Sequence, residues 1–99
     1  MTVRLFSGGR ECFVSPFVAR FVANVCRAVA GSLKAPPAQG RIEFVLDEGR
    51  VELRVDGASV ALDGRQGFAS SIVEDTLRGM VGRLKGVDPE GPLRVEVEL

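Results

Sequence analysis

Four basic side chains recur at matching positions in two helix-like segments and are the main candidates for chemistry in this sequence. Arg27 and Arg78 are 51 positions apart, and so are Lys34 and Lys85. Guanidinium and ammonium groups bind phosphates and carboxylates, so this set could form two symmetric anion contacts. The alternative is a solvated helix face on which cations near the C-terminus complement the helix dipole.

The sequence contains no His, and its two cysteines, Cys12 and Cys26, lie among apolar neighbours. The lack of His excludes Ser–His and Cys–His nucleophile pairs and the usual zinc ligand sets. We therefore expect no catalytic residue, no cofactor, no metal site and no enzymatic activity. Catalysis by a carboxylate, Lys or Cys alone is the alternative, although no motif supports it. We expect both cysteines to be buried thiols that act as small apolar side chains, with a disulfide or a reactive thiolate as the alternatives.

The composition predicts one globular domain, residues 1–99. Thirteen basic residues balance thirteen acidic ones, and 45% of the residues are hydrophobic. The absence of a basic excess argues against nucleic acid as a partner. The N-terminal stretch "MTVRLFSGGRE" has no apolar signal region, and no segment has the roughly 18 apolar residues of a membrane span. These features predict a cytoplasmic protein without a membrane partner.

The two halves of the sequence are similar to each other. The segment "AGSLKA" at 30–35 matches "VGRLKG" at 81–86 at an offset of 51, and "VRLFSGGREC" matches "VELRVDGASV" at an offset of 48. A period near 50 that occurs only twice indicates a duplicated half-domain rather than a solenoid. We assign the half-repeats to residues 2–47 and 50–99.

Each half reads as two strands, a helix and a strand. "TVRLF" and "RVELRV" alternate apolar and polar residues, and "SGG" and "VDGA" supply hairpin turns before return strands at 11–15 and 59–63. Ser15 and Pro16 suit the N-cap and first position of a helix at 17–34, and the second helix is expected at 66–85. The closing strands are "RIEFVL" and "LRVEVEL".

The predicted helices carry apolar stripes at three-to-four spacing that we expect to face the core. In the first helix the stripe consists of Phe17, Phe21, Val25, Ala28 and Leu33, joined by Val18, Val22 and Val29. In the second helix it consists of Ile72, Val73, Thr76, Leu77, Met80, Val81 and Leu84.

Together these elements predict an α+β fold made of a duplicated ββαβ unit related by a pseudo-two-fold axis. One mostly antiparallel six-stranded sheet would carry both helices on one face. The tight turn "LDEGRV" pairs the third strand with the fourth, so symmetry pairs the sixth with the first. The predicted strand order is therefore 2-1-6-3-4-5.

Three helical glycines need an explanation, because each costs about 1 kcal/mol relative to Ala inside a helix. Gly31, Gly79 and Gly82 lie toward the ends of the two helices. We expect the helices to touch each other there. Close packing of each helix on the sheet and a docking site for a ligand or partner helix are the alternatives.

The pattern of hairpin, "SPFV", helix, "GSLK" and strand resembles a set of small, uncharacterised bacterial and archaeal proteins. The similarity covers nearly the whole chain twice, although Gly67-Phe68 replaces Pro-Phe in the second half. No activity is known for that group, so the resemblance implies only the architecture. The matching residues are Gly9, Ser15, Pro16, Phe17, Val18, Asn24, Gly31, Ser32, Leu33 and Lys34, and then Gly57, Asp75, Gly79, Met80, Val81, Leu84, Lys85 and Gly86.

The sequence therefore predicts a small, non-catalytic cytoplasmic interaction or assembly module that binds a protein partner or a second copy of itself. The alternative is a binder of a small anionic ligand or nucleic acid through the repeated basic residues.

Overall fold

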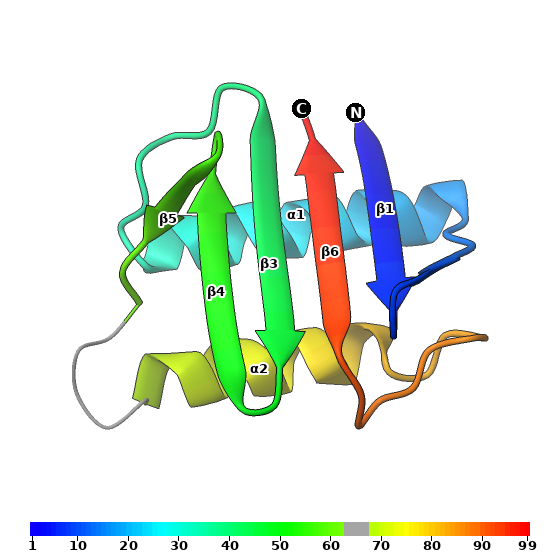
Figure 1. Ribbon diagram of the computed structural model, residues 1–99. Helices are drawn as coiled ribbons and strands as arrows, with labels where there is room; N and C mark the ends of the chain where they lie inside the picture. The colour runs from blue at the N-terminus through cyan, green and yellow to red at the C-terminus, as the bar shows by residue number, and fades with distance from the viewer. Residues whose placement is uncertain (63–67) are drawn as a thin grey trace.

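The computed structural model describes residues 1–62 and 68–99 and has an α+β fold (Figure 1). Six strands form one antiparallel open sheet, and both helices cross the same face of it. In chain order the elements are β1 (Thr2–Ser7), β2 (Arg10–Cys12), α1 (Pro16–Ser32), β3 (Arg41–Asp47), β4 (Arg50–Val55), β5 (Ala58–Val60), α2 (Phe68–Val81) and β6 (Leu93–Glu98).

The strand order is β2-β1-β6-β3-β4-β5, so the order predicted from the turn between the halves is confirmed. The last strand of the chain lies between β1 and β3. Val95 pairs with Leu5 on one side and with Phe44 on the other. The two termini consequently lie side by side at the same end of the neighbouring strands β1 and β6 (Figure 1).

The three predicted tight turns are present. The two central residues of each turn have positive φ, as in the type I′ turns that match the twist of a hairpin. In the turn between β3 and β4, Glu48 has a φ of 47° and Gly49 a φ of 77°, a region that glycine enters without steric cost. The return strands β2 and β5 end at Cys12 and Val60, earlier than predicted. The end of the second predicted return strand, at 63, lies outside the described residues.

Helix α1 begins as the sequence predicts. Ser15 is the N-cap, with its hydroxyl oxygen accepting a hydrogen bond from the Val18 N–H at 3.3 Å, and Pro16 is the first helical residue. The helix ends at Ser32, because Lys34 adopts a left-handed φ of 59°. Helix α2 ends at Val81, and its predicted first residues, 66 and 67, lie outside the described part of the chain.

The core lies between the sheet and the helix layer. Alternate residues of the four long strands point toward the helices, as expected for a sheet with one covered face. The buried strand residues are Leu5, Ile42, Phe44, Leu46, Leu53, Val55, Leu93, Val95 and Val97, and they meet Val22, Ala23, Cys26 and Ala30 of α1 and Val73, Leu77 and Val81 of α2.

The predicted inward face of α1 is confirmed at Val22, which is buried, but it is wrong for the two phenyl rings. Phe17 is 70% exposed and Phe21 51% exposed, whereas small side chains such as Cys26 and Ala30 face the sheet. Apolar residues surround this helix, so their spacing fits more than one face. Small inward residues let the helix approach the strands closely, which leaves the phenyl rings outside. In α2, Ile72 is likewise 51% exposed.

Asp56, in the turn between β4 and β5, fastens the loop that joins α1 to β3. Its carboxylate accepts hydrogen bonds from the backbone N–H groups of Gln39, Gly40 and Arg41 at 2.8–2.9 Å. Its own N–H donates to the Arg41 carbonyl at 2.8 Å. The three backbone donors lower the pKa of the Asp56 carboxyl below its usual value of 3.8.

This arrangement predicts acid sensitivity at one position. A carboxyl whose pKa is lowered on folding stabilises the protein above its usual pKa of 3.8 and loses that effect as the pH falls through the folded-state value. Asp56→Ala should therefore lower the free energy of unfolding at pH 7, and the difference from wild type should shrink toward pH 2. Urea titrations across this range measure it. The same substitution at the exposed Asp47 should have little effect, and equal losses at both positions would contradict the role of Asp56.

Candidate functional site

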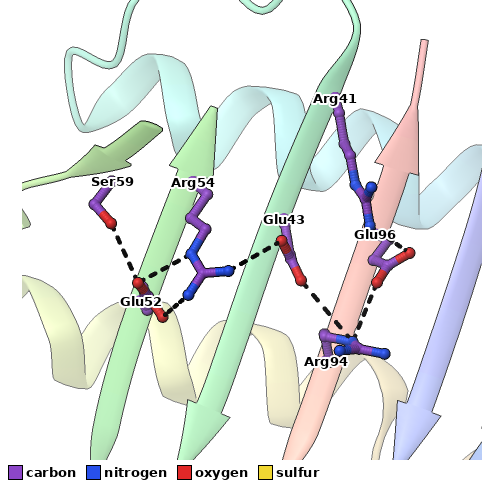
Figure 2. A network of polar contacts seen from close by, with 7 residues as sticks. All are labelled: Arg41, Glu43, Glu52, Arg54, Ser59, Arg94 and Glu96. Carbon is purple, nitrogen blue, oxygen red and sulfur yellow. Dashed lines mark hydrogen bonds and ion pairs between the residues drawn. The ribbon is translucent and has the colours of Figure 1, made fainter. Parts of the chain in front are cut away.

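The sheet face opposite the helices carries a row of charges that pair with one another (Figure 2). Glu43 of β3 and Glu96 of β6 occupy directly opposed positions in the sheet register. Two carboxylates so placed would repel each other. Arg94 lies between them, with its Nε atom 3.1 Å from Glu96 and 3.9 Å from Glu43, and Arg41 approaches Glu96 at 2.8 Å. The Glu96 side chain is only 6% exposed, so this compensation is essential.

The row continues toward the β5 edge of the sheet (Figure 2). Arg54 lies 3.8 Å from Glu43 and donates hydrogen bonds to Glu52 at 3.0 and 3.1 Å. The hydroxyl of Ser59 donates to the same carboxylate at 3.2 Å. Hydrogen bonding to Arg54 lowers the pKa of the Glu52 carboxyl and raises the pKa of Arg54. Charge therefore alternates across three neighbouring strands, β4, β3 and β6.

Toward the β2 edge, an aromatic ring takes part in the same surface. The guanidinium carbons of Arg94 and Arg4 lie 4.3 and 5.2 Å from the centre of the Phe6 ring, within cation–π range. Arg4 also donates two hydrogen bonds to Glu11, which lower the pKa of that carboxyl. In the described part of the chain, every buried side-chain nitrogen and oxygen has a hydrogen-bond partner. The arginines and glutamates of this face therefore pair mainly with one another, and we call this surface the saturated sheet face.

The four basic residues predicted as anion contacts do not converge. Lys34 follows the end of α1 and Lys85 follows the end of α2, and the helices run in opposite directions (Figure 1). The two lysines therefore lie toward opposite ends of the helix layer. Arg27 is exposed and borders a pocket of about 230 Å³ whose other lining residues are almost all apolar. These residues do not form a single basic site.

Arg78 has a structural role that differs from that of its counterpart Arg27. Its Nε atom donates to Glu74 at 2.9 Å, and its Nη1 atom donates to the carbonyls of Pro89 and Gly91, both at 2.8 Å. The guanidinium thus fastens the loop between α2 and β6. A symmetric pair of anion contacts at Arg27 and Arg78 does not fit this geometry. The spacing of Glu74 and Arg78, four residues apart on one helix, was the available sequence signal.

The predicted contact between the two helices at their glycines is wrong. A methyl group added at Gly31 or Gly79 would meet no other atom within 4 Å. At Gly82 the added carbon would lie 2.5 Å from the Arg78 carbonyl oxygen and 3.1 Å from Cβ of Pro89, so the close neighbours are the α2 backbone and the following loop. Glycine spacing alone could not separate an open surface from a close approach.

The outer side of the helix layer carries three large exposed apolar side chains, Phe17, Phe21 and Ile72. Phe17 and Phe21 lie one turn apart with ring centres separated by 6.3 Å. Beside them, a groove of about 400 Å³ runs between α1 and α2 and is lined almost entirely by apolar side chains. We call Phe17, Phe21, Ile72 and this groove the outer helix face. The groove-lining residues include Val25, Ala28, Val29, Ile72, Val73 and Thr76.

Neither cysteine forms a disulfide. Cys26 is completely buried, and burial raises the pKa of its thiol to about 12. The thiol therefore stays protonated near neutral pH, which makes Cys26 a poor nucleophile. Cys12 is half-buried, and its thiol donates to the Gly86 carbonyl at 3.5 Å. Within residues 1–62 and 68–99, no group of three His, Cys, Asp or Glu side chains is placed to hold a metal ion.

No protein-family model, curated protein sequence or solved structure matches this chain. Among the described residues, no helix has the length and apolar character needed to cross a membrane.

The ion-pair row predicts that Arg94 matters mainly by separating two carboxylates. Arg94→Met leaves Glu43 and Glu96 directly opposed and should lower the free energy of unfolding by about 1–3 kcal/mol. Adding Glu96→Gln should restore part of the loss, because the repulsion is removed. Chemical denaturation of the three proteins measures this coupling. Arg50→Met is the matched control, because within the described residues Arg50 has no ion pair. Additive losses in the double variant would contradict the role of Arg94.

The two glycine environments in and after α2 predict opposite effects of one methyl group. Gly79→Ala should stabilise the protein by about 0.4–1 kcal/mol, because alanine favours the helix and restricts the unfolded chain. Gly82→Ala should destabilise it by about 1–3 kcal/mol, because the methyl group meets occupied space. Thermal and urea unfolding at low protein concentration test both changes. The same sign at both positions would show that their surroundings are not as described.

Proposed function

We propose that this protein is a small, non-catalytic interaction module that docks a protein partner on its outer helix face. The observation that carries the proposal is the pair of exposed rings on α1. Phe17 and Phe21 are 70% and 51% exposed, and the groove between α1 and α2 is lined almost entirely by apolar side chains. Burying a Phe side chain is worth about 1.5–3 kcal/mol, so contact with a partner would gain free energy that the isolated chain forgoes. Exposed apolar patches of this kind typically mark protein–protein contacts.

The saturation of the opposite face supports the same assignment. On the sheet side, arginines and glutamates pair with each other across β1, β6, β3 and β4. A partner that displaced these pairs would have to desolvate charges and replace contacts already made. The outer helix face presents no such barrier. A non-catalytic role is supported by the absence of His from the sequence and by the commitment of the sheet-face charges to one another.

The alternative of an anion or nucleic-acid binder has less support. Arg78 is held by Glu74 and two loop carbonyls, and Lys34 and Lys85 lie toward opposite ends of the helix layer. The whole chain carries no net charge. A nucleic-acid surface would instead concentrate cations on one face. We also assign the protein to the cytoplasm, where free thiols such as Cys12 and Cys26 remain reduced.

We further propose that the chain arose by duplication of a ββαβ unit, with a pseudo-two-fold axis between β3 and β6. Strand pairing supports this. Leu5 pairs with Cys12 in the first half and Leu53 with Val60 in the second, each position shifted by 48. Leu5 pairs with Val95 and Leu53 with Phe44, which preserves the registers under shifts of 48 and 51. Such a history would place two equivalent helices on one face, ready to form a joint docking surface.

Site-specific photo-cross-linking in living cells tests the docking proposal. p-Benzoylphenylalanine at position 21 should give covalent adducts with a protein on irradiation, because this side chain projects from the outer helix face. The same group at position 45, on the saturated sheet face, is the control and should give few adducts. Adducts from position 45 alone, or none from position 21, would contradict the proposal.

A further inference from the structure

Four outward residues of α1 form a seam with the spacing of a helix–helix contact. Phe17, Phe21, Asn24 and Ala28 are all exposed and follow one another at intervals of four, three and four residues. Gly31 continues the series and is exposed as well. This is the spacing of the a and d positions at which two helices interlock. The seam contains no charged residue, although Arg20 and Arg27 lie on the same helix.

The seam is bulky at one end and small at the other. Phe17 and Phe21 lie near the start of α1, and Ala28 and Gly31 lie near its end. A methyl group at Gly31 would meet no atom of this chain, so nothing within the monomer requires the missing side chain. In an antiparallel pair of identical seams centred on Asn24, Phe17 faces Gly31 of the second copy and Phe21 faces Ala28. Large side chains then oppose small ones on both sides of the central Asn24, the arrangement that packs a helix interface without voids.

The groove provides room for the rings of a second copy. Ala28 lines it, so a phenyl ring placed opposite Ala28 enters the groove beside Val25 and Val29. A cavity of about 150 Å³ holds a benzene molecule, whereas this groove measures about 400 Å³. It therefore has space for the Phe21 ring of the second copy. An isologous, two-fold contact uses the same surface on both copies, so that surface must carry both the projecting ring and the groove that receives it.

The polar residue at the centre of the seam also suits a second copy. Asn24 carries both hydrogen-bond donors and an acceptor, so two Asn side chains can pair across a two-fold axis. Helix α2 carries Asp75 at the position equivalent to Asn24. Two copies of α2 paired in the same way would bring two carboxylates together. The choice between the helices therefore falls on α1.

From these observations we infer that two copies of the chain associate through antiparallel α1 helices, which places Phe21 of each copy against Ala28 of the other. The inference rests on the proposed docking function of the outer helix face and identifies its partner as a second copy. The molecule measures 34 × 28 × 19 Å, and its broad face is large enough for the roughly 800 Å² that each partner buries in a standard interface. Because the contact centres on one helix, we expect a dimer of micromolar affinity.

Sedimentation equilibrium of the purified full chain from about 1 µM to about 1 mM tests the inference. The mass should rise from 10.6 kDa toward twice that value. Phe21→Ala should weaken association at least tenfold, and Ala28→Phe should also weaken it by placing two rings opposite each other. The double variant Phe21→Ala/Ala28→Phe should recover most of the affinity, because large again opposes small. Phe13→Ala is the control, since Phe13 is 83% exposed but outside the seam.

Each alternative result has a definite meaning when circular dichroism shows that the variants are folded. A wild-type chain that stays monomeric at 1 mM overturns the inference, while cross-linking of a different protein through position 21 would leave the docking proposal standing. Self-association that Phe21→Ala and Ala28→Phe do not weaken, or a double variant without recovery, overturns the antiparallel pairing. Absence of both self-association and position-21 adducts removes the docking proposal as well.

Discussion

The insertion of β6 between β1 and β3 is the contact on which the rest of the structure depends. It joins the final strand of the chain to the first strand and to the end of the first half, so the sheet is continuous only when the whole chain is present. Val95 lies at its centre, buried against Leu5 and Phe44. Each half taken alone would expose a strand edge and half of the core, and about 50 residues bury too little surface for an independent domain.

The same strand also determines how the two faces of the molecule differ. Its alternate residues send Leu93, Val95 and Val97 toward the helices and Arg94 and Glu96 toward the open face. On the open face, Arg94 forms ion pairs with the two opposed carboxylates and places its guanidinium over the Phe6 ring. The charged groups of this face are therefore occupied by one another. Among the described residues, the ion pairs of the helix layer are limited to Glu74 and Arg78 of α2. The inward residues of α1 include small ones such as Ala23, Cys26 and Ala30, so Phe17 and Phe21 remain outside, and new contacts can form there.

Much of the fold followed from local patterns in the sequence. The hairpin turns, the N-cap at Ser15 and the strand order were predictable because turn residues, capping residues and period-two alternation each reflect neighbouring backbone geometry. The inward face of α1 was not predictable, because apolar residues surround that helix and only the fit against the sheet decides between faces. The open surroundings of Gly31 and Gly79 could not be predicted either, because they depend on the separation of the two helices.

The candidate site was harder to predict than the fold. Repetition suggested that Arg27 and Arg78 act alike, but the loop after α2 brings two carbonyls to Arg78, and only Arg27 stays exposed. Spacing along a chain does not report where a distant loop will lie. The outer helix face could not be predicted either. Phe side chains are normally assigned to the core, and only the structure shows which side of α1 packs on the sheet.

The central claim is that contacts form on the helix side of the molecule and not on the sheet side. Aromatic and methyl nuclear magnetic resonance spectra, recorded over a concentration series, test it residue by residue in one experiment. We expect the signals of Phe17, Phe21 and Ile72 to shift or broaden as the protein is concentrated, while those of Phe6 and Val45 on the sheet face stay constant. Changes confined to Phe6 and Val45, or equal on both faces, would contradict it.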